Sequence, residues 1–229
     1  SGVIGAYFYE NTENPNALLL VLIPFLCCIA GAAFLALIYS FLTVTLKVNQ
    51  NVTGLAITTL GTGIGNFFGS SIVGLSGGSG SVALPKTAAV YKTTFPFMSG
   101  AADLAYTGFL LYLSIIIALV AAWVLNRSRV GLNLRAVGEN PATADAAGIN
   151  VTGYKYAATV IGGAVAGLGG LYFVMDYTNG GWTNNGFGDR GWLAIAIVIF
   201  ALWKPRFAVV ASVIFGGLYI ACVKIDGLS

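Results

Sequence analysis

The side chains that most often carry catalysis or bind metal ions are scarce in this sequence. None of the 229 residues is histidine, which removes the commonest general base and metal ligand. The three cysteines, Cys27, Cys28 and Cys222, stand in apolar runs, where a thiol behaves as a small hydrophobic group. Their spacing matches neither a metal-binding motif nor a disulfide framework. We therefore expect no catalytic residue, no metal site and no cofactor.

Amide and aromatic side chains are the remaining candidates for contacts with a ligand. Asn49 and Asn51 precede an apolar run, Asn66 and Phe67 lie within it, and Trp192 opens a later one. Amides offer hydrogen bonds and rings offer flat apolar faces, so this set suits a neutral solute that contains a ring. An anchor at a membrane interface is the alternative role for Trp192.

The composition places the elements that must position these residues in a membrane. Of the residues, 57% are apolar and only 8% are charged, and the mean hydropathy is +0.85. Soluble domains carry about 25% charged residues. Several apolar runs exceed the roughly 18 residues that a spanning helix needs. The predicted fold is therefore all-α, a polytopic transmembrane helical bundle.

The apolar runs predict five to six membrane segments, counted at about 20 residues each. Four runs cover residues 17–46, 55–74, 104–125 and 156–175. A fifth, 191–203, is too short to cross alone, and after Lys204, Pro205 and Arg206 a sixth run covers 207–223. The sequence here fits either a helical hairpin with a basic tip or a discontinuous pair of helices. Residues 10–16, 75–103 and 176–190 are expected to be loops.

Glycines spaced four residues apart predict close helix contacts within the bundle. Gly163 and Gly167 form one such pair. Gly61, Gly65 and Gly69 form another row, for which helix packing is favoured over contact with a solute.

Residues 126–155 are the only long polar segment between two membrane-length apolar runs. Asn140 and Pro141 predict a helix start, Gly148 predicts its stop, and ATADAA lies between them. The result is a helix of one to two turns with small side chains. The segment also carries Arg127, Arg129, Arg135 and Lys155, so the positive-inside rule places it in the cytoplasm and the three loops outside.

The residues support neither ATP binding nor coupling to an ion gradient. No GxxxxGK[ST] motif occurs, and the glycine-rich residues 162–170 follow no strand, so ATP binding through a P-loop is not predicted. Asp103, Asp176 and Asp189 stand at the ends of apolar runs or in loops, whereas ion-coupled carriers place ionisable groups inside the membrane.

Three strings resemble the permeases of bacterial ABC importers for branched-chain amino acids, simple sugars and nucleosides. Residues 131–155, GLNLRAVGENPATADAAGINVTGYK, resemble the cytoplasmic loop of that family, with its pattern LRAxGxNxxAAxxxGI. The strings LKVNQNVTGLAITTLGTG at 46–63 and RGWLAIAIVIFALWKP at 190–205, with IFGG after it, are most similar to the nucleoside and simple-sugar branch. The pattern is matched at Leu134, Arg135, Ala136, Gly138, Asn140, Ala144, Gly148 and Ile149.

The resemblance implies a multi-pass permease subunit of the bacterial inner membrane, without enzymatic activity of its own. Two such subunits, identical or homologous, would form the pathway for a nucleoside or simple sugar within the lipid bilayer. Cytoplasmic ATPase subunits would dock on the loop, an extracytoplasmic solute-binding protein would deliver the solute, and no nucleic acid is involved. The residues assigned to ATPase coupling are Arg135, Gly138, Glu139, Asn140, Pro141, Ala144, Asp145 and Gly148.

The chain is expected to be one transmembrane permease domain, 1–229, with the cytoplasmic coupling loop 126–155 within it. The family's first membrane helices have no counterpart here, so upstream sequence is expected to be missing. The alternatives from other classes are an ion-coupled secondary transporter and a channel or scaffold subunit of a membrane complex.

Overall fold

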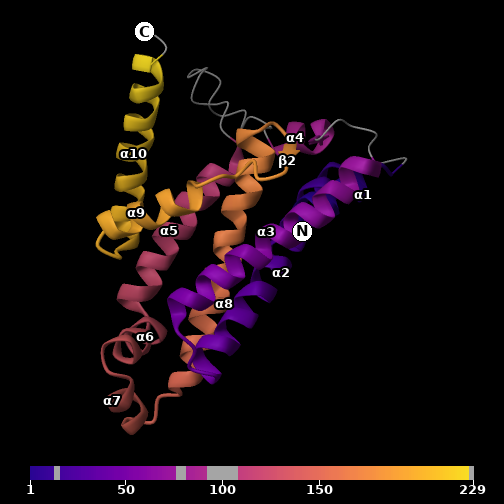
Figure 1. Cartoon of the computed structure of the whole chain (residues 1–229). Coiled ribbons are helices and arrows are strands. Elements are labelled where there is room, and N and C mark those ends of the chain that lie inside the picture. The colour runs from indigo at the N-terminus through magenta and orange to yellow at the C-terminus, as the bar shows by residue number, and fades with distance from the viewer. Residues whose placement is uncertain (13–15, 76–80, 92–107, 227–229) are drawn as a thin grey trace. The chain divides into compact units, whose positions relative to one another are not determined.

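Helices make up nearly all of the described chain. The structure is a computed structural model that describes residues 1–12, 16–75, 81–91 and 108–226, without the side chains of residues 17 and 223–226. The elements in chain order (Figure 1) are α1 (Gly2–Glu10), α2 (Ala17–Ser40), the π-helical turn η1 (Phe41–Thr45), α3 (Gln50–Leu75), β1 (Ser81–Ala83), α4 (Pro85–Tyr91), α5 (Phe109–Arg127), α6 (Arg129–Glu139), α7 (Pro141–Ala146), α8 (Val151–Tyr172), the π-helical turn η3 (Phe173–Tyr177), β2 (Gly181–Thr183), α9 (Arg190–Phe200) and α10 (Pro205–Asp226). The predicted all-α class is confirmed.

The chain divides into two compact units, which are described separately. Unit 1 comprises Ser1–Leu111 and Val137–Phe187. Unit 2 comprises Tyr112–Ala136 and Gly188–Ser229.

Four helices of the described residues are long and apolar enough to cross a membrane. They are Leu18–Thr45, Phe109–Arg127, Val151–Tyr177 and Pro205–Cys222. The expected five to six segments included α3 and α9. However, α9 has only 11 residues, and α3 is long enough but is too rich in glycine, threonine and serine to count as strongly apolar. The chain is thus a multi-pass membrane protein. Its long helix α3 carries both polar and apolar side chains.

The core of unit 1 is the packing of α2 against α8, which lie side by side (Figure 1). A Cβ on Gly163 would collide with Ala36, and a Cβ on Gly167 would collide with Ala32. The two backbones can approach this closely only because glycines face alanines. The thiol of Cys28 donates a hydrogen bond to the carbonyl of Gly167, 3.0 Å away. The predicted close contact at Gly163 and Gly167 is therefore confirmed.

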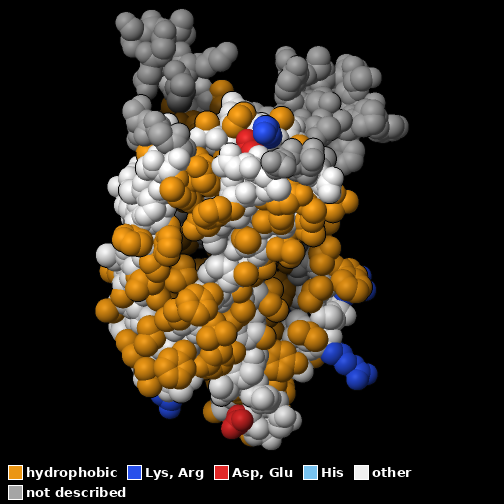
Figure 2. All heavy atoms as spheres, turned by 90° about the vertical axis from the view of Figure 1, so that its right-hand side faces the viewer, with side chains coloured by type: hydrophobic (Ala, Val, Ile, Leu, Met, Phe, Trp, Pro, Cys, Tyr) orange, Lys and Arg blue, Asp and Glu red, His pale blue; other side chains and the backbone are white. Residues whose placement is uncertain are grey.

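The opposite face of α2 carries large apolar side chains that nothing covers within the described chain. Leu18, Leu22 and Leu26 follow one another at one-turn spacing, and all three are exposed. Figure 2 shows hydrophobic side chains spread over most of one face of the molecule, with few charged groups. Such a surface is stable only against lipid or another apolar surface.

A two-stranded sheet and a short helix close one end of unit 1. β1 pairs with β2 antiparallel, with Ser81 opposite Thr183 and Val82 opposite Trp182. The carboxylate of Glu10, at the end of α1, accepts hydrogen bonds from the first turn of α4: from the N–H of Lys86 at 3.0 Å and from the N–H and hydroxyl of Thr87 at 3.2 and 2.6 Å. A buried carboxylate is stable there because backbone and hydroxyl donors satisfy it.

The prediction that 75–103 and 176–190 are loops is therefore wrong in part. Residues 81–83 and 181–183 form the sheet and residues 85–91 form α4, while 76–80 and 92–103 lie outside the described residues. Three-residue strands show no usable alternation in a sequence, and their pairing depends on helices that lie between them in the chain.

In unit 2, the chain breaks between α9 and α10 at the position that the proline predicted. Leu202 and Trp203 both have positive φ, 51° and 58°, and Pro205 is the first residue of α10. The rings of Phe200 and Phe215 lie 5.3 Å apart in an edge-to-face arrangement, so the two helices contact each other beyond the break.

Candidate functional site

Local rules define the short helix α7 in the polar segment. The side chain of Asn140 accepts a hydrogen bond from the N–H of Thr143, 3.2 Å away, so it caps the helix start. Pro141 is the first helical residue, where no N–H is required. Gly148 has φ of +81°, a conformation that costs other residues energy, and the N–H of Ile149 bonds back to the carbonyl of Ala144. The predicted start and stop of this helix are confirmed.

The residues assigned to coupling differ in exposure on α7. Ala144 is only 3% exposed and packs inward. The exposed residues of α7 are Pro141, Ala142, Thr143, Asp145 and Ala146. Ala144 thus fixes the helix in place, while small neighbours form its outer surface.

A tight elbow connects α5 to α6 within unit 2. The hydroxyl of Ser128 donates to the carbonyl of Val124 and accepts from the N–H of Gly131. A Cβ on Gly131 would collide with the carbonyl of Val124, so glycine is required by the close approach. The guanidinium of Arg135 donates to the side-chain oxygen of Asn126 at 2.6 Å. Arg135 therefore stabilises the connection between α5 and α6 in addition to carrying a charge.

Two polar residues assigned to a solute path stand at the start of α3. The side-chain oxygen of Asn49 accepts hydrogen bonds from the N–H groups of Asn51 and Val52, at 3.0 and 3.4 Å, which is a helix cap. This structural role explains the presence of Asn49 without a solute. Asn51 is exposed on the first turn.

The exposed surface of α3 carries hydroxyl groups in addition to apolar side chains. Thr58, Thr59 and Thr62 each donate a hydrogen bond of 2.9 Å to the carbonyl four residues earlier. A hydroxyl that donates to its own helix still has lone pairs to accept a bond from outside. α3 can therefore offer acceptors without leaving backbone groups unsatisfied.

The far end of α3 contacts the turn that contains β2. The side-chain N–H of Asn66 donates to the side-chain oxygen of Asn185 at 3.1 Å, and that of Asn184 donates to the hydroxyl of Ser70 at 3.1 Å. Between these bonds, the indole of Trp182 occupies the space that a side chain on Gly69 would fill. Phe67 is next to Asn66 but is 70% exposed.

The predicted helix packing along Gly61, Gly65 and Gly69 is thus wrong at its last residue. Gly69 receives an indole ring from a strand, and a Cβ on Gly65 would meet nothing within 4 Å in the described chain. Sequence reasoning missed Trp182 because it stands in a polar, glycine-rich segment without periodicity. Neighbouring Gly180 and Gly181 were the only local signal for a tight turn.

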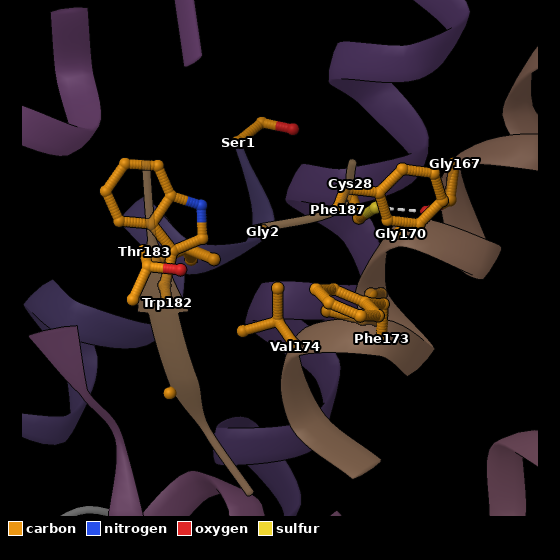
Figure 3. Close-up of a pocket in the computed structure, with 13 residues that line it drawn as sticks. Ser1, Gly2, Cys28, Gly167, Gly170, Phe173, Val174, Trp182, Thr183 and Phe187 are labelled. Carbon is orange, nitrogen blue, oxygen red and sulfur yellow. Dashed lines mark hydrogen bonds between the residues drawn. The ribbon is translucent and has the colours of Figure 1, made fainter. Parts of the chain in front are cut away.

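A cavity of about 270 Å³ lies in unit 1 behind Trp182 (Figure 3). Its walls come from the first residues of α1, from Cys28 on α2, and from α8, η3 and the β2 turn. The predicted path residue Trp192 belongs to unit 2, where it is exposed on α9. Asn51, Asn66 and Phe67 lie on α3 and Asn49 caps its start, so Asn49 and Asn51 are several turns away from the other two.

α8 separates the two candidate regions of unit 1. α7 lies just before its first residue, and β2 follows η3 at its other end. The continuous helix Val151–Tyr177 has 27 residues. At 1.5 Å per residue it measures about 40 Å, which exceeds the roughly 30 Å of a bilayer core. This length predicts that α7 and the β1–β2 sheet lie on opposite sides of the membrane.

Sequence comparisons show the family of this chain of spanning helices. The family described as "Branched-chain amino acid transport system / permease component" matches residues 2–225. TsgC13 of Haloferax volcanii, named for a glucose ABC transporter permease, is 34% identical over 212 residues, covering 88% of this chain and 60% of that protein. The guanosine ABC transporter permease protein NupQ of Bacillus subtilis is 29% identical over 83% of this chain and 60% of its own length.

A third relative matches a shorter stretch. The nucleoside ABC transporter permease protein NupC of Lactococcus lactis is 37% identical over 105 residues, which is 46% of this chain and 33% of that protein. The chain spans 60% or less of the length of these three relatives. No solved structure gives a significant match.

Fold and comparisons together define a class, the multi-pass helical permeases of the cell membrane. Within that class, the chain belongs to the family of permease components of the branched-chain amino acid transport system. The resemblance found in the three sequence strings is confirmed.

Proposed function

We propose that this chain is a permease subunit of an ATP-binding-cassette importer and forms part of the pathway for a nucleoside or a simple sugar. A second permease subunit would complete the pathway, separate cytoplasmic ATPase subunits would supply the energy, and an extracytoplasmic binding protein would deliver the solute. Family membership supports this function.

The observation that carries the proposal is the form of α7. It is a capped helix whose buried Ala144 fixes it at the end of a spanning helix, while Ala142, Thr143 and Ala146 are exposed. Small side chains let a helix enter a narrow cleft in a partner. A partner that moves this helix would transmit the motion directly to α8, because Asn150 caps α8 two residues after Gly148.

We further propose that α3 lines the solute path. It is the long helix of the described chain that falls short of a spanning helix in apolarity, and it exposes Asn51, Thr58 and Thr62. A neutral solute with hydroxyl or amide groups needs such acceptors, and no ionised group. Asn66 and Phe67 remain proposed contacts of this path, and Trp192 of unit 2 separately remains a proposed solute contact.

The relatives name two kinds of solute. TsgC13 is named for glucose, whereas NupC and NupQ are named for nucleosides and guanosine. Both kinds are neutral ring compounds, which agrees with a path that uses amides, hydroxyls and aromatic faces.

Replacing Ala146 with tryptophan tests the coupling role of α7. In proteoliposomes that contain the complete importer, Ala146→Trp should abolish ATP-driven uptake, because the indole would not fit a cleft shaped for alanine. Ala146→Ser is the matched control and should retain uptake. Ala144→Trp is a poorer test, because Ala144 is buried and the ring would displace α7 whatever its partner. Normal ATP-driven uptake by Ala146→Trp would contradict the coupling role.

The same vesicles separate the alternatives. Uptake driven by an ion gradient in the absence of ATPase subunits would identify a secondary transporter instead. Solute flux that needs neither a gradient nor ATP would identify a channel. ATP-dependent uptake alone supports the importer.

A further inference from the structure

A hydrogen bond joins two segments of unit 1 that are far apart in the chain. η1 lies between α2 and α3, and it packs against α8. The hydroxyl groups of Thr45 on η1 and Tyr156 on α8 are hydrogen-bonded to each other, although they are 111 residues apart in the chain. This bond connects the start of α8 with the segment that leads into α3.

On one side of this bond, the first turns of α8 follow directly after α7. The N–H of Ile149 bonds to the carbonyl of Ala144 at 3.0 Å, which closes α7. Asn150 then caps α8 by accepting from the N–H of Gly153 at 2.9 Å. Tyr156 stands on the second turn of the same helix. Because successive turns of an α-helix are hydrogen-bonded to one another, a displacement of α7 would move Tyr156 with it.

On the other side of the bond, the chain leaves the α-helical conformation between α2 and α3. The N–H of Leu46 bonds to the carbonyl of Phe41 at 3.2 Å. The N–H of Val48 bonds to the carbonyl of Leu42 at 3.1 Å. Both bonds span more residues than an α-helical bond. Lys47 has φ of +53°, a conformation that is unfavourable for a residue with a side chain.

A buried serine adds to the irregularity of this segment. Ser40 ends α2 and is fully buried, and none of the described groups forms a hydrogen bond with its hydroxyl. An unpaired buried hydroxyl is unfavourable and is uncommon in proteins. Residues 40–47 thus combine this hydroxyl with a π-helical turn and a positive φ. Such features concentrate at functional sites and in segments that change conformation.

These observations give the two hydroxyl groups a role in coupling. We propose that Tyr156 is a positioning residue that transmits a displacement of α7, through Thr45 and η1, to the start of α3. The irregular backbone of η1 lets α3 follow this displacement without distortion of α2. The inference rests on the proposed function, and it identifies the residues through which movement at α7 reaches the helix proposed to line the solute path.

Conservative substitutions separate the hydrogen bond from the packing around it. Tyr156→Phe keeps the ring and removes one hydroxyl, and Thr45→Val removes the other. Thr45→Ser keeps the hydroxyl and should preserve the bond. Thr43→Val and Thr159→Val are matched controls on the same two segments, because each removes a hydroxyl that donates to the carbonyl four residues earlier, at 2.8 and 2.9 Å.

The first measurement is the amount of solute imported per ATP hydrolysed in proteoliposomes that contain the complete importer. The probe is whichever of radiolabelled guanosine, uridine and glucose the unmodified importer takes up. Tyr156→Phe and Thr45→Val should each lower this ratio roughly three- to tenfold while ATP hydrolysis continues, the range for loss of one hydrogen bond between neutral groups. The double variant should be no worse than either single variant, because both remove the same bond. Thr45→Ser and the two controls should match the unmodified importer.

The second measurement follows α3 itself and does not depend on uptake. In a background without the three native cysteines, Asn51→Cys places a thiol on the exposed first turn of α3. The rate of its reaction with a thiol reagent is measured in nanodiscs with and without a non-hydrolysable ATP analogue. The rate should change with the analogue in the presence of Tyr156 and in Thr159→Val. This change should be lost in Tyr156→Phe.

Four outcomes would overturn the inference: an unchanged import ratio in Tyr156→Phe, an equal loss in the control variants, additive effects of the two single variants, or the same response of Asn51→Cys with and without the Tyr156 hydroxyl. If Thr45→Val does not assemble, Tyr156→Phe and the labelling decide. ATP-driven uptake by the unmodified importer leaves the proposed function standing in each case. Absence of ATP-driven uptake of all three probes would refute the proposed function, and this inference with it.

Discussion

Gly138 and Gly148 lie in the same polar segment, but only Gly148 has a conformation that requires glycine. Its φ is +81°, whereas Gly138 has no positive φ and open space around its Cβ. Sequence reasoning assigned both to coupling because both match a family pattern. The structure gives them different physical roles: Gly148 ends α7, and Gly138 is an exposed position on α6.

Alanine substitutions distinguish these roles. Gly148→Ala forces a Cβ into the left-handed region at a cost of roughly 1–2 kcal/mol, so the end of α7 should loosen and ATP-driven uptake should fall several-fold. Gly138→Ala should leave uptake unchanged, because alanine is favoured over glycine inside a helix. Uptake in proteoliposomes is compared at equal amounts of inserted protein. Equal uptake by the two variants would show that the shape of α7 does not matter for coupling.

At the scale of elements, the contact of β2 with α3 depends on the absence of a side chain at Gly69. Trp182 fills the space beside Gly69, and the hydrogen bonds of Asn66 and Ser70 flank it. β2 is also paired with β1, which precedes α4. One indole thus links α3 to the sheet and forms a wall of the cavity.

A double-mutant cycle measures this link. Gly69→Ala should lower the melting temperature of the protein in detergent, because the added methyl group displaces the indole. In a Trp182→Ala background the same change should cost little, so the two effects should not be additive. Gly65→Ala is the control and should have no effect, since its Cβ would meet open space. Additive effects of Gly69→Ala and Trp182→Ala would mean that the two residues do not interact.

The elements that sequence could predict are those whose signals are local. Apolar runs placed α2, α5, α8 and α10, and Asn140, Pro141 and Gly148 placed both ends of α7. The sheet, the bond of Glu10 to α4, and the place of Trp182 beside Gly69 could not be predicted. Each depends on groups far apart in the chain that the bundle brings together, and neither partner carries a signal by itself.

At the scale of the whole molecule, α8 fixes the sides of the membrane. Its length predicts that α7 lies on one side and the β2 turn on the other. Arg127 and Arg135 lie in the segment before α7, so the positive-inside rule predicts that this side is cytoplasmic.

Cysteine labelling tests this orientation. In a background without the three native cysteines, Asp145→Cys should react with a membrane-impermeant thiol reagent only from the cytoplasmic side. Asn184→Cys should react only from the outside. Both positions are exposed, so neither should be protected by its own packing. Labelling of both positions from the same side of oriented vesicles would contradict the topology.

The pairing of β1 with β2 also has a consequence for the order in which the protein is made. The two strands are separated in the chain by the whole of α4 to α8. During synthesis, β1 is therefore complete long before β2 exists. Until then, the backbone N–H and C=O groups of β1 must form hydrogen bonds with water or with another group. Closing so long a loop is entropically costly until the intervening helices have packed. The sheet and the contact of Trp182 with Gly69 can therefore form only after α8 has been synthesised.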